Sequence, residues 1–332
     1  MTHATGIGSM PGTSSREAIV AVRDLLLDAD RLGIPYLPET PDRGPGADMI
    51  GRAAGLLVDL PVDLQPSGWR FTDRPGRDMR RTASLLTEDL DELAAAYDGY
   101  AGPLKVQVAG PWTLAASVEL NRGERAVTDE GAAREIVASL AEGVRRHVAD
   151  VRRLVPGAEV IVQLDEPSIT AVLEGTLPTQ SGFGKVRAVD RQVVARGLQD
   201  VLAALDGRTV IHSCHPRAPI PLLRTVKPGA VAVDLTDPSP GRWESLAATM
   251  EVGVDLYAGC LRTLGPAGAT SAREAARGIR DGLERAGLGA EWLDHVTITP
   301  ACGLAGLTPK GAHDVHRVAV DTAHELSEEA TR

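Results

Sequence analysis

The sequence predicts an α/β fold, a single (β/α)8 TIM barrel with one insertion. Three observations lead to this prediction: short runs rich in β-branched residues recur along the chain, helical stretches separate them, and 332 residues suit one barrel of this kind. No internal repeat of solenoid period is present, so we take residues 1–332 as one domain. A doubly wound open sheet is the structural alternative.

Eight short runs are predicted to be strands. Most of them are rich in Val and Ile and almost continuously apolar, as parallel strands buried on both faces are. In chain order they are residues 5–9, 34–39, 105–109, 160–165, 209–214, 230–234, 254–260 and 296–302. Eight parallel strands, each followed by a helix, make a closed barrel.

The stretches between these runs carry helix signals. Thr128 is a predicted N-cap, and the two acidic residues after it suit the positive end of a helix dipole. Apolar residues then recur at helical spacing over residues 136–155, which predicts one long amphipathic helix. Thr308 as cap and Pro309 at the first helical position predict the start of the last helix.

Residues 60–81, between the second and third predicted strands, differ in composition from the rest of the chain. They are rich in Pro, Gly and Arg, which are typical of turns and exposed segments rather than of a buried strand. We expect them to form an insertion after the second strand, lying over one mouth of the barrel.

Charge and composition exclude several partners. A formal net charge of −10 argues against nucleic acid and anionic membranes, because either would repel the protein on average. The first residues lack a secretory signal, and no apolar run approaches the roughly 18 residues of a membrane span. Three cysteines are too few for a disulfide scaffold. We therefore expect a cytoplasmic protein with no nucleic-acid or membrane partner.

In a barrel of this kind the active site lies at the carboxyl ends of the strands. The predicted strands end, at nearly every position, in polar or metal-ligating residues. These are Ser9, Glu39, Asp165 with Glu166, His212 with Cys214, Asp234, Cys260 and Cys302.

His212 and Cys214 are one residue apart at a strand end, so both side chains point to the same face. Imidazole and thiolate are the ligands that zinc prefers, and Cys302 ends another strand at the same mouth. We predict a zinc site on these three residues, with Asp234 or Cys260 as a further ligand. The alternative is a buried histidine beside an inert cysteine.

Other polar groups at the mouth suit an amino acid. The turn at residues 6–11 is suited to offer backbone N–H groups to a carboxylate, although it could equally be a plain strand-to-helix turn. Glu39 and Asp165 are candidates to hold an ammonium group, and ordinary ion pairs are their alternative.

Five short motifs follow one another along the chain. They are IGSMP at residues 7–11, GPWT at 110–113, QLDEP at 163–167, HSC at 212–214 and PACGL at 300–304. In this order they resemble the IGSFP, GPxT, QxDEP, HxC and PDCGL motifs of the catalytic barrel of cobalamin-independent methionine synthase. That family belongs to a superfamily shared with uroporphyrinogen decarboxylase.

The resemblance implies roles for these residues. Zinc would be held by His212, Cys214 and Cys302, with Asp234 standing where the family has a glutamate. Homocysteine would be bound by the backbone and side chains of one segment and by two carboxylates, namely Ile7, Gly8, Ser9, Glu39 and Asp165. Glu39 and Asp165 would also act in catalysis, by fixing the amino end of the substrate during transfer.

The chain resembles the short members of the family. It has no second, N-terminal barrel, and residues 259–264 lack a histidine that the long enzymes carry there. The resemblance implies a zinc-dependent methyltransferase acting on a thiol, most simply homocysteine to give methionine, with a corrinoid protein or methyltetrahydrofolate as methyl donor. A metal-free decarboxylase of the uroporphyrinogen type and a non-catalytic zinc- or thiol-binding protein are the alternatives.

Overall fold

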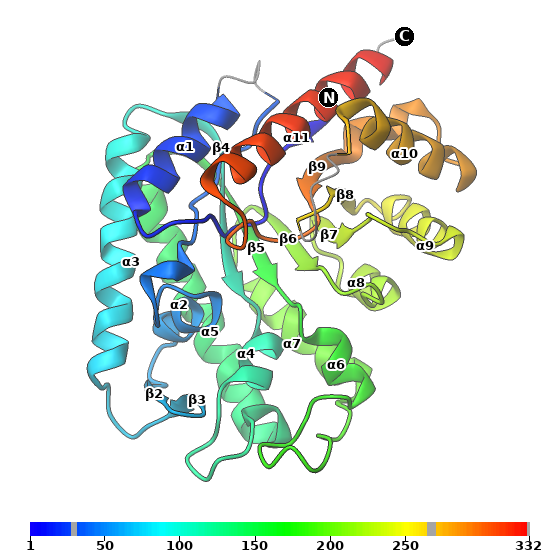
Figure 1. Cartoon of the computed structure of the whole chain (residues 1–332). Helices are drawn as coiled ribbons and strands as arrows, with labels where there is room; N and C mark the ends of the chain where they lie inside the picture. The colour runs from blue at the N-terminus through cyan, green and yellow to red at the C-terminus, as the bar shows by residue number, and fades with distance from the viewer. Residues whose placement is uncertain (28–31, 264–269, 331–332) are drawn as a thin grey trace.

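A curled parallel sheet forms the centre of the protein (Figure 1). The computed structural model describes residues 1–27, 32–263 and 270–330; Leu264, the last residue of the segment compared above, lies outside these ranges. The seven strands lie in the order β1 (His3–Ala4), β9 (Val296–Pro300), β8 (Asp255–Leu261), β7 (Ala230–Asp234), β6 (Arg208–Ser213), β5 (Gly157–Asp165) and β4 (Ala101–Ala109). All six neighbouring pairs are parallel, as predicted for buried strands.

The predicted strand at residues 34–39 is not a continuous strand. Three isolated parallel bridges replace it: Gly33 pairs with Ala4, Glu39 with Ser9, and Tyr36 with Lys105. The physical reason is that residues 35 and 38 are prolines, which have no N–H to donate to a ladder. This segment therefore bridges to the β1 side and to β4, the two edges of the sheet.

Helices cover the outside of the curled sheet (Figure 1). They are α1 (Ser15–Leu27), α2 (Met49–Leu56), α3 (Arg77–Ala96), α4 (Pro111–Ser117), α5 (Glu130–Leu154), α6 (Ile169–Glu174), α7 (Arg191–Ala203), α8 (Ile220–Val226), α9 (Pro240–Met250), α10 (Ala272–Arg285) and α11 (Pro309–Ala330). The last helix packs against both α10 and α1. In the described part of the chain, no helix combines the length and the apolar character needed to cross a bilayer.

The two predicted helix starts have different outcomes. The start at Pro309 is confirmed, and the Thr308 hydroxyl accepts a hydrogen bond from the Gly311 N–H at 3.1 Å. The predicted cap at Thr128 is wrong, because Thr128 ends a short 3-10 turn (Ala126–Thr128). Asp129 is the N-cap of α5, and its carboxylate accepts from the Ala132 N–H at 2.8 Å.

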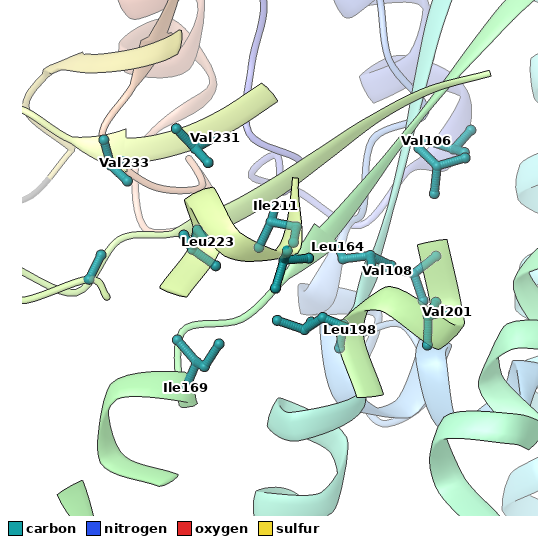
Figure 2. Close-up of a cluster of buried hydrophobic side chains, with 14 of the residues drawn as sticks. Val106, Val108, Leu164, Ile169, Leu198, Val201, Ile211, Leu223, Val231 and Val233 are labelled. Atoms are coloured by element: carbon teal, nitrogen blue, oxygen red, sulfur yellow. The ribbon is translucent and has the colours of Figure 1, made fainter. Parts of the chain in front are cut away.

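Successive side chains of each strand point alternately to the inside of the curled sheet and to the helices outside it. Outward residues such as Val231 and Val233 pack with helix residues such as Leu198 and Leu223 in the main core, as Figure 2 shows. The strand residues that alternate with these point inward and, together with Ile34, form a small inner cluster. Its members are Ile34, Ile161, Val210, Ala230, Ala232 and Tyr257. Because successive side chains of a strand alternate, Asp165 and His212 belong to the inner face.

The predicted insertion contains a β-hairpin. β2 (Val62–Gln65) pairs antiparallel with β3 (Gly68–Phe71). Glu119, which follows α4, accepts from Phe71 N–H at 2.9 Å and donates its own N–H to Trp69 at 2.8 Å. The hairpin thus docks beside the segment that leaves the carboxyl end of β4.

Candidate active site

The GPWT and QLDEP motifs form one structural unit. The buried Glu166 carboxylate accepts from the N–H groups of Trp112 and Thr113 at 2.9 and 2.8 Å, and from the Thr113 hydroxyl at 2.7 Å. It therefore caps the start of α4. Gly110 is required, since a Cβ there would overlap this carboxylate. Glu166 is consequently a structural residue and not a ligand of the site.

Asp165 and His212 are neighbours in register and are joined by a hydrogen bond. The His212 Nδ1 lies 2.8 Å from Asp165 Oδ1, and both side chains are buried. The same oxygen accepts from Gln163 Nε2 at 2.7 Å. An acceptor carboxylate at Nδ1 assigns the proton to that nitrogen and leaves the lone pair on Nε2. That Nε2 is buried and has no hydrogen-bond partner.

The two predicted cysteine ligands lie together, partly buried. The thiols of Cys214 and Cys302 share a hydrogen bond, which lowers the pKa of Cys302 and raises that of Cys214. The structure thus gathers His212, Cys214 and Cys302 from the ends of two distant strands.

Asp234 and Cys260, the two candidates for a further zinc ligand, lie in different surroundings. Asp234 ends β7 at the same end of the sheet, where its Oδ1 accepts from the N–H and the hydroxyl of Thr236, both at 2.8 Å. Cys260 is buried in the main apolar core with helix residues, and burial raises its pKa to about 12. Cys260 therefore faces the helices, and Asp234 alone remains available.

The donor set suits zinc, although it is not arranged as a finished metal site. Across residues 1–27, 32–263 and 270–330, no group of three or more His, Cys, Asp or Glu side chains is arranged to hold a metal ion. The donor types are nevertheless those that zinc prefers. The unpartnered, buried Nε2 of His212 is the atom that a metal would satisfy.

Glu39 and Asp165 share the inner face of the sheet. Burial raises the pKa of Glu39 to about 7, opposed by the guanidinium of Arg52 and reinforced by the charge of Asp165. Gln107 Nε2 lies 3.4 Å and Arg52 Nε 3.9 Å from the Glu39 carboxylate. The two buried carboxylates act on one another electrostatically, and a cation between them would offset this repulsion.

The IGS segment is anchored on both sides. The Ile7 carbonyl accepts from Lys105 Nζ and Gln163 Nε2, and the Gly8 carbonyl accepts from the Glu39 N–H at 3.1 Å. On the other side, the Ser9 carbonyl accepts from the Leu304 N–H at 2.9 Å. The segment is therefore fixed against both Glu39 and the loop that carries the late cysteine.

Two buried cations were not among the predicted site residues. Lys105 is fully buried on β4, and burial lowers its pKa to about 7. A lysine inside an apolar run is the sequence signal that could have found it. Arg52 bridges Glu39 to the buried Asp89, which also binds Arg43 at 2.5 Å. No spacing in the sequence points to that network.

Two surface hollows lie away from the predicted site residues. A groove of about 1220 Å³ separates α5 from α7, and a smaller hollow of about 330 Å³ lies between the loops after β6 and β7. None of the predicted site residues lines either one.

Residues 1–325 match the protein family described as the catalytic domain of cobalamin-independent synthase. The chain belongs to this family. The resemblance inferred from the five motifs is thereby confirmed, and methionine synthase-like activity is the activity that this family indicates.

Among solved structures, the chain is similar to a B12-independent methionine synthase from Shewanella sp. W3-18-1, in complex with selenomethionine. The similarity has a TM-score of 0.67 at 12% sequence identity and covers 99% of this chain and 98% of that chain. At this identity it supports the fold alone. A comparison with curated proteins gives no match.

Proposed function

We infer that the protein is a zinc-dependent methyltransferase that transfers a methyl group to the thiol of homocysteine, giving methionine. The observation that carries this proposal is the buried Nε2 of His212, which has no partner while Asp165 occupies the other ring nitrogen. Such a histidine is oriented as metal-ligating histidines are, by a carboxylate on its far nitrogen.

His212, Cys214 and Cys302 would hold the zinc, with Asp234 as the fourth ligand. When bound, zinc keeps a thiol deprotonated and nucleophilic at neutral pH. The part of Asp165 is to hold the imidazole in the required orientation. Asp234 would have to exchange or share its bonds to Thr236 to act as a ligand.

Homocysteine would lie with its amino group between Glu39 and Asp165. Two buried carboxylates on the inner face support this orientation, because an ammonium group offsets their repulsion. Its carboxylate would accept backbone N–H groups of the IGS segment. The selenomethionine in the solved relative is consistent with an amino acid of this size.

We further propose that the sheet closes as a (β/α)8 barrel, with residues 33–39 as the eighth strand. Support comes from the bridges that this segment makes to both edges of the sheet, and from the packing of α11 against α1. Closure would bring Glu39 and Asp165 to the same mouth as Cys302. The methyl donor is a methyl-corrinoid protein or methyltetrahydrofolate, and the assay below distinguishes the two.

Zinc analysis with a matched pair of variants tests the metal. We expect about one equivalent of zinc in the wild-type protein and in Cys260→Ser, whose thiol faces the core, and far less in Cys214→Ser. Equal zinc contents in the two variants would refute the site.

A turnover assay with homocysteine tests the reaction. Zinc-loaded protein is given methylcobalamin or methyltetrahydrofolate, and methionine is measured. Methionine from either donor supports the proposal and identifies the donor class. Failure with both donors, by protein that holds zinc, would leave a zinc-binding protein without this activity.

A further inference from the structure

The carbonyl of Ile7 is held by two buried side chains. Lys105 Nζ donates to it at 2.8 Å and Gln163 Nε2 at 2.9 Å, and both side chains are fully buried. The Lys105 ammonium also lies 5.0 Å from the centre of the Tyr36 ring. A buried ammonium is expensive unless it is paired and hydrogen-bonded, so its retention here points to a role beyond packing.

Holding the Ile7 carbonyl also fixes the N–H of the next residue, Gly8, because both groups belong to one planar peptide unit. In a trans peptide the carbonyl of one residue and the N–H of the next point in opposite directions, and the described residues contain no cis bond. The Gly8 N–H therefore points away from Lys105 and Gln163. Within the described residues, the N–H groups of Gly8 and Ser9 make no hydrogen bond. Buried backbone N–H groups rarely lack a partner, so a ligand is the natural acceptor.

The charge of Lys105 also offsets the negative charge that a substrate carboxylate would meet in this site. Glu39 and Asp165 suit the amino group of an amino acid, but both would repel its carboxylate. Lys105 lies close enough for its charge to act on both carboxylates. Donating to the Ile7 carbonyl also polarises that peptide and makes the Gly8 N–H a better donor.

We propose that Lys105 is a positioning residue that makes the site specific for thiols carrying a carboxylate. It acts by fixing the peptide between Ile7 and Gly8, so that the Gly8 N–H meets the substrate carboxylate. This inference rests on the proposed function, because it takes the thiol substrate to be an amino acid.

The test compares two thiols in wild-type protein and in Lys105→Met, which keeps an unbranched side chain one atom shorter and removes its charge. The thiols are homocysteine and aminopropanethiol, which is homocysteine without its carboxyl group. We expect Lys105→Met to raise KM for homocysteine about tenfold, the loss caused by one hydrogen bond of ordinary strength, with kcat little changed. KM for aminopropanethiol should stay within about twofold of wild type. Tyr257→Phe, a change at another inner residue, should leave both KM values unaltered.

A purely structural role for Lys105 predicts that Lys105→Met raises KM equally for both thiols, and that result would overturn the proposal. An unchanged KM for homocysteine would overturn it as well. Thermal unfolding of Lys105→Met controls for misfolding. If wild-type protein methylates neither thiol, the proposed function fails. The inference is then judged by calorimetric binding of methionine and of the amine left by its decarboxylation. Selective weakening of methionine binding in Lys105→Met supports the inference, and any other pattern, including no binding to wild type, refutes it.

Discussion

The two sides of the candidate site differ in how completely their polar atoms are paired. On the amino-acid side, the Glu39 carboxylate is paired with Gln107 and Arg52, and the Lys105 ammonium is paired with the Ile7 carbonyl. On the metal side, the Nε2 of His212 is buried without a partner and the two thiols bond only weakly to one another. The difference teaches that the charged side chains of the amino-acid side are paired before any ligand binds, whereas the metal side needs an ion to complete it.

Asp165 joins these two sides, so its replacement is expected to have the largest effect. Asp165→Asn removes the charge that orients His212 and one of the two carboxylates facing the substrate amine. We expect zinc affinity to fall about 10- to 100-fold, the usual effect of losing such an outer partner. Homocysteine binding should fall in addition. Chelator competition and calorimetry measure the two separately, and a loss confined to one side would contradict the shared role.

Glu39→Gln should affect the amino-acid side alone. The carboxamide keeps the shape of the side chain but cannot pair with an ammonium group. We expect KM for homocysteine to rise about 10- to 100-fold, as for the loss of a charge-assisted hydrogen bond. Zinc content is the internal control and should equal that of wild type. A fall in zinc content would mean that the two sides are not separable.

The pH dependence of methionine binding sharpens the same comparison. Because burial raises the pKa of Glu39 to about 7, its carboxylate is charged at pH 8 and mostly protonated at pH 6. A protonated carboxyl cannot hold the amine, so affinity is lost as the pH falls through 7. We expect about a tenfold weakening between pH 8 and pH 6 in Lys105→Met, which lacks the ammonium whose own pKa burial lowers to about 7, and a flatter profile when Glu39→Gln is added, both followed by calorimetry. Methionine is used because its thioether does not titrate. Equal profiles would contradict the assignment.

Asp234→Asn should have the smallest effect, and only on the metal side. An amide is a poorer zinc ligand than a carboxylate, but the Thr236 N–H can still be satisfied by its oxygen. We expect zinc affinity to fall about tenfold and methionine binding to stay as in wild type. Thr236→Val is the matched control, since it frees Asp234 from one hydrogen bond and should not weaken zinc binding. Unchanged zinc affinity in Asp234→Asn would exclude it as a ligand.

The sequence predicted which polar side chains lie at the same end of the sheet better than it predicted the bounds of the elements that carry them. Residues such as His212 and Cys302 were found because the carboxyl ends of parallel strands meet at one edge, which is a property of topology alone. The strand at residues 34–39 was overestimated because its prolines were outweighed by apolar neighbours. Lys105 was missed because its partner is the carbonyl of Ile7, 98 positions away in the chain, and no local pattern encodes such a contact.

The cap of α4 by Glu166 has a consequence for how this chain can be divided. The helix that follows β4 is completed by a carboxylate from the end of β5, so the two successive β/α units are interlocked rather than modular. A version split between residues 117 and 157 would place α4 and its capping carboxylate on different fragments. Breaks that keep Gly110 and Glu166 on the same piece are therefore the ones to choose for reassembly or for exchanging half-barrels between relatives.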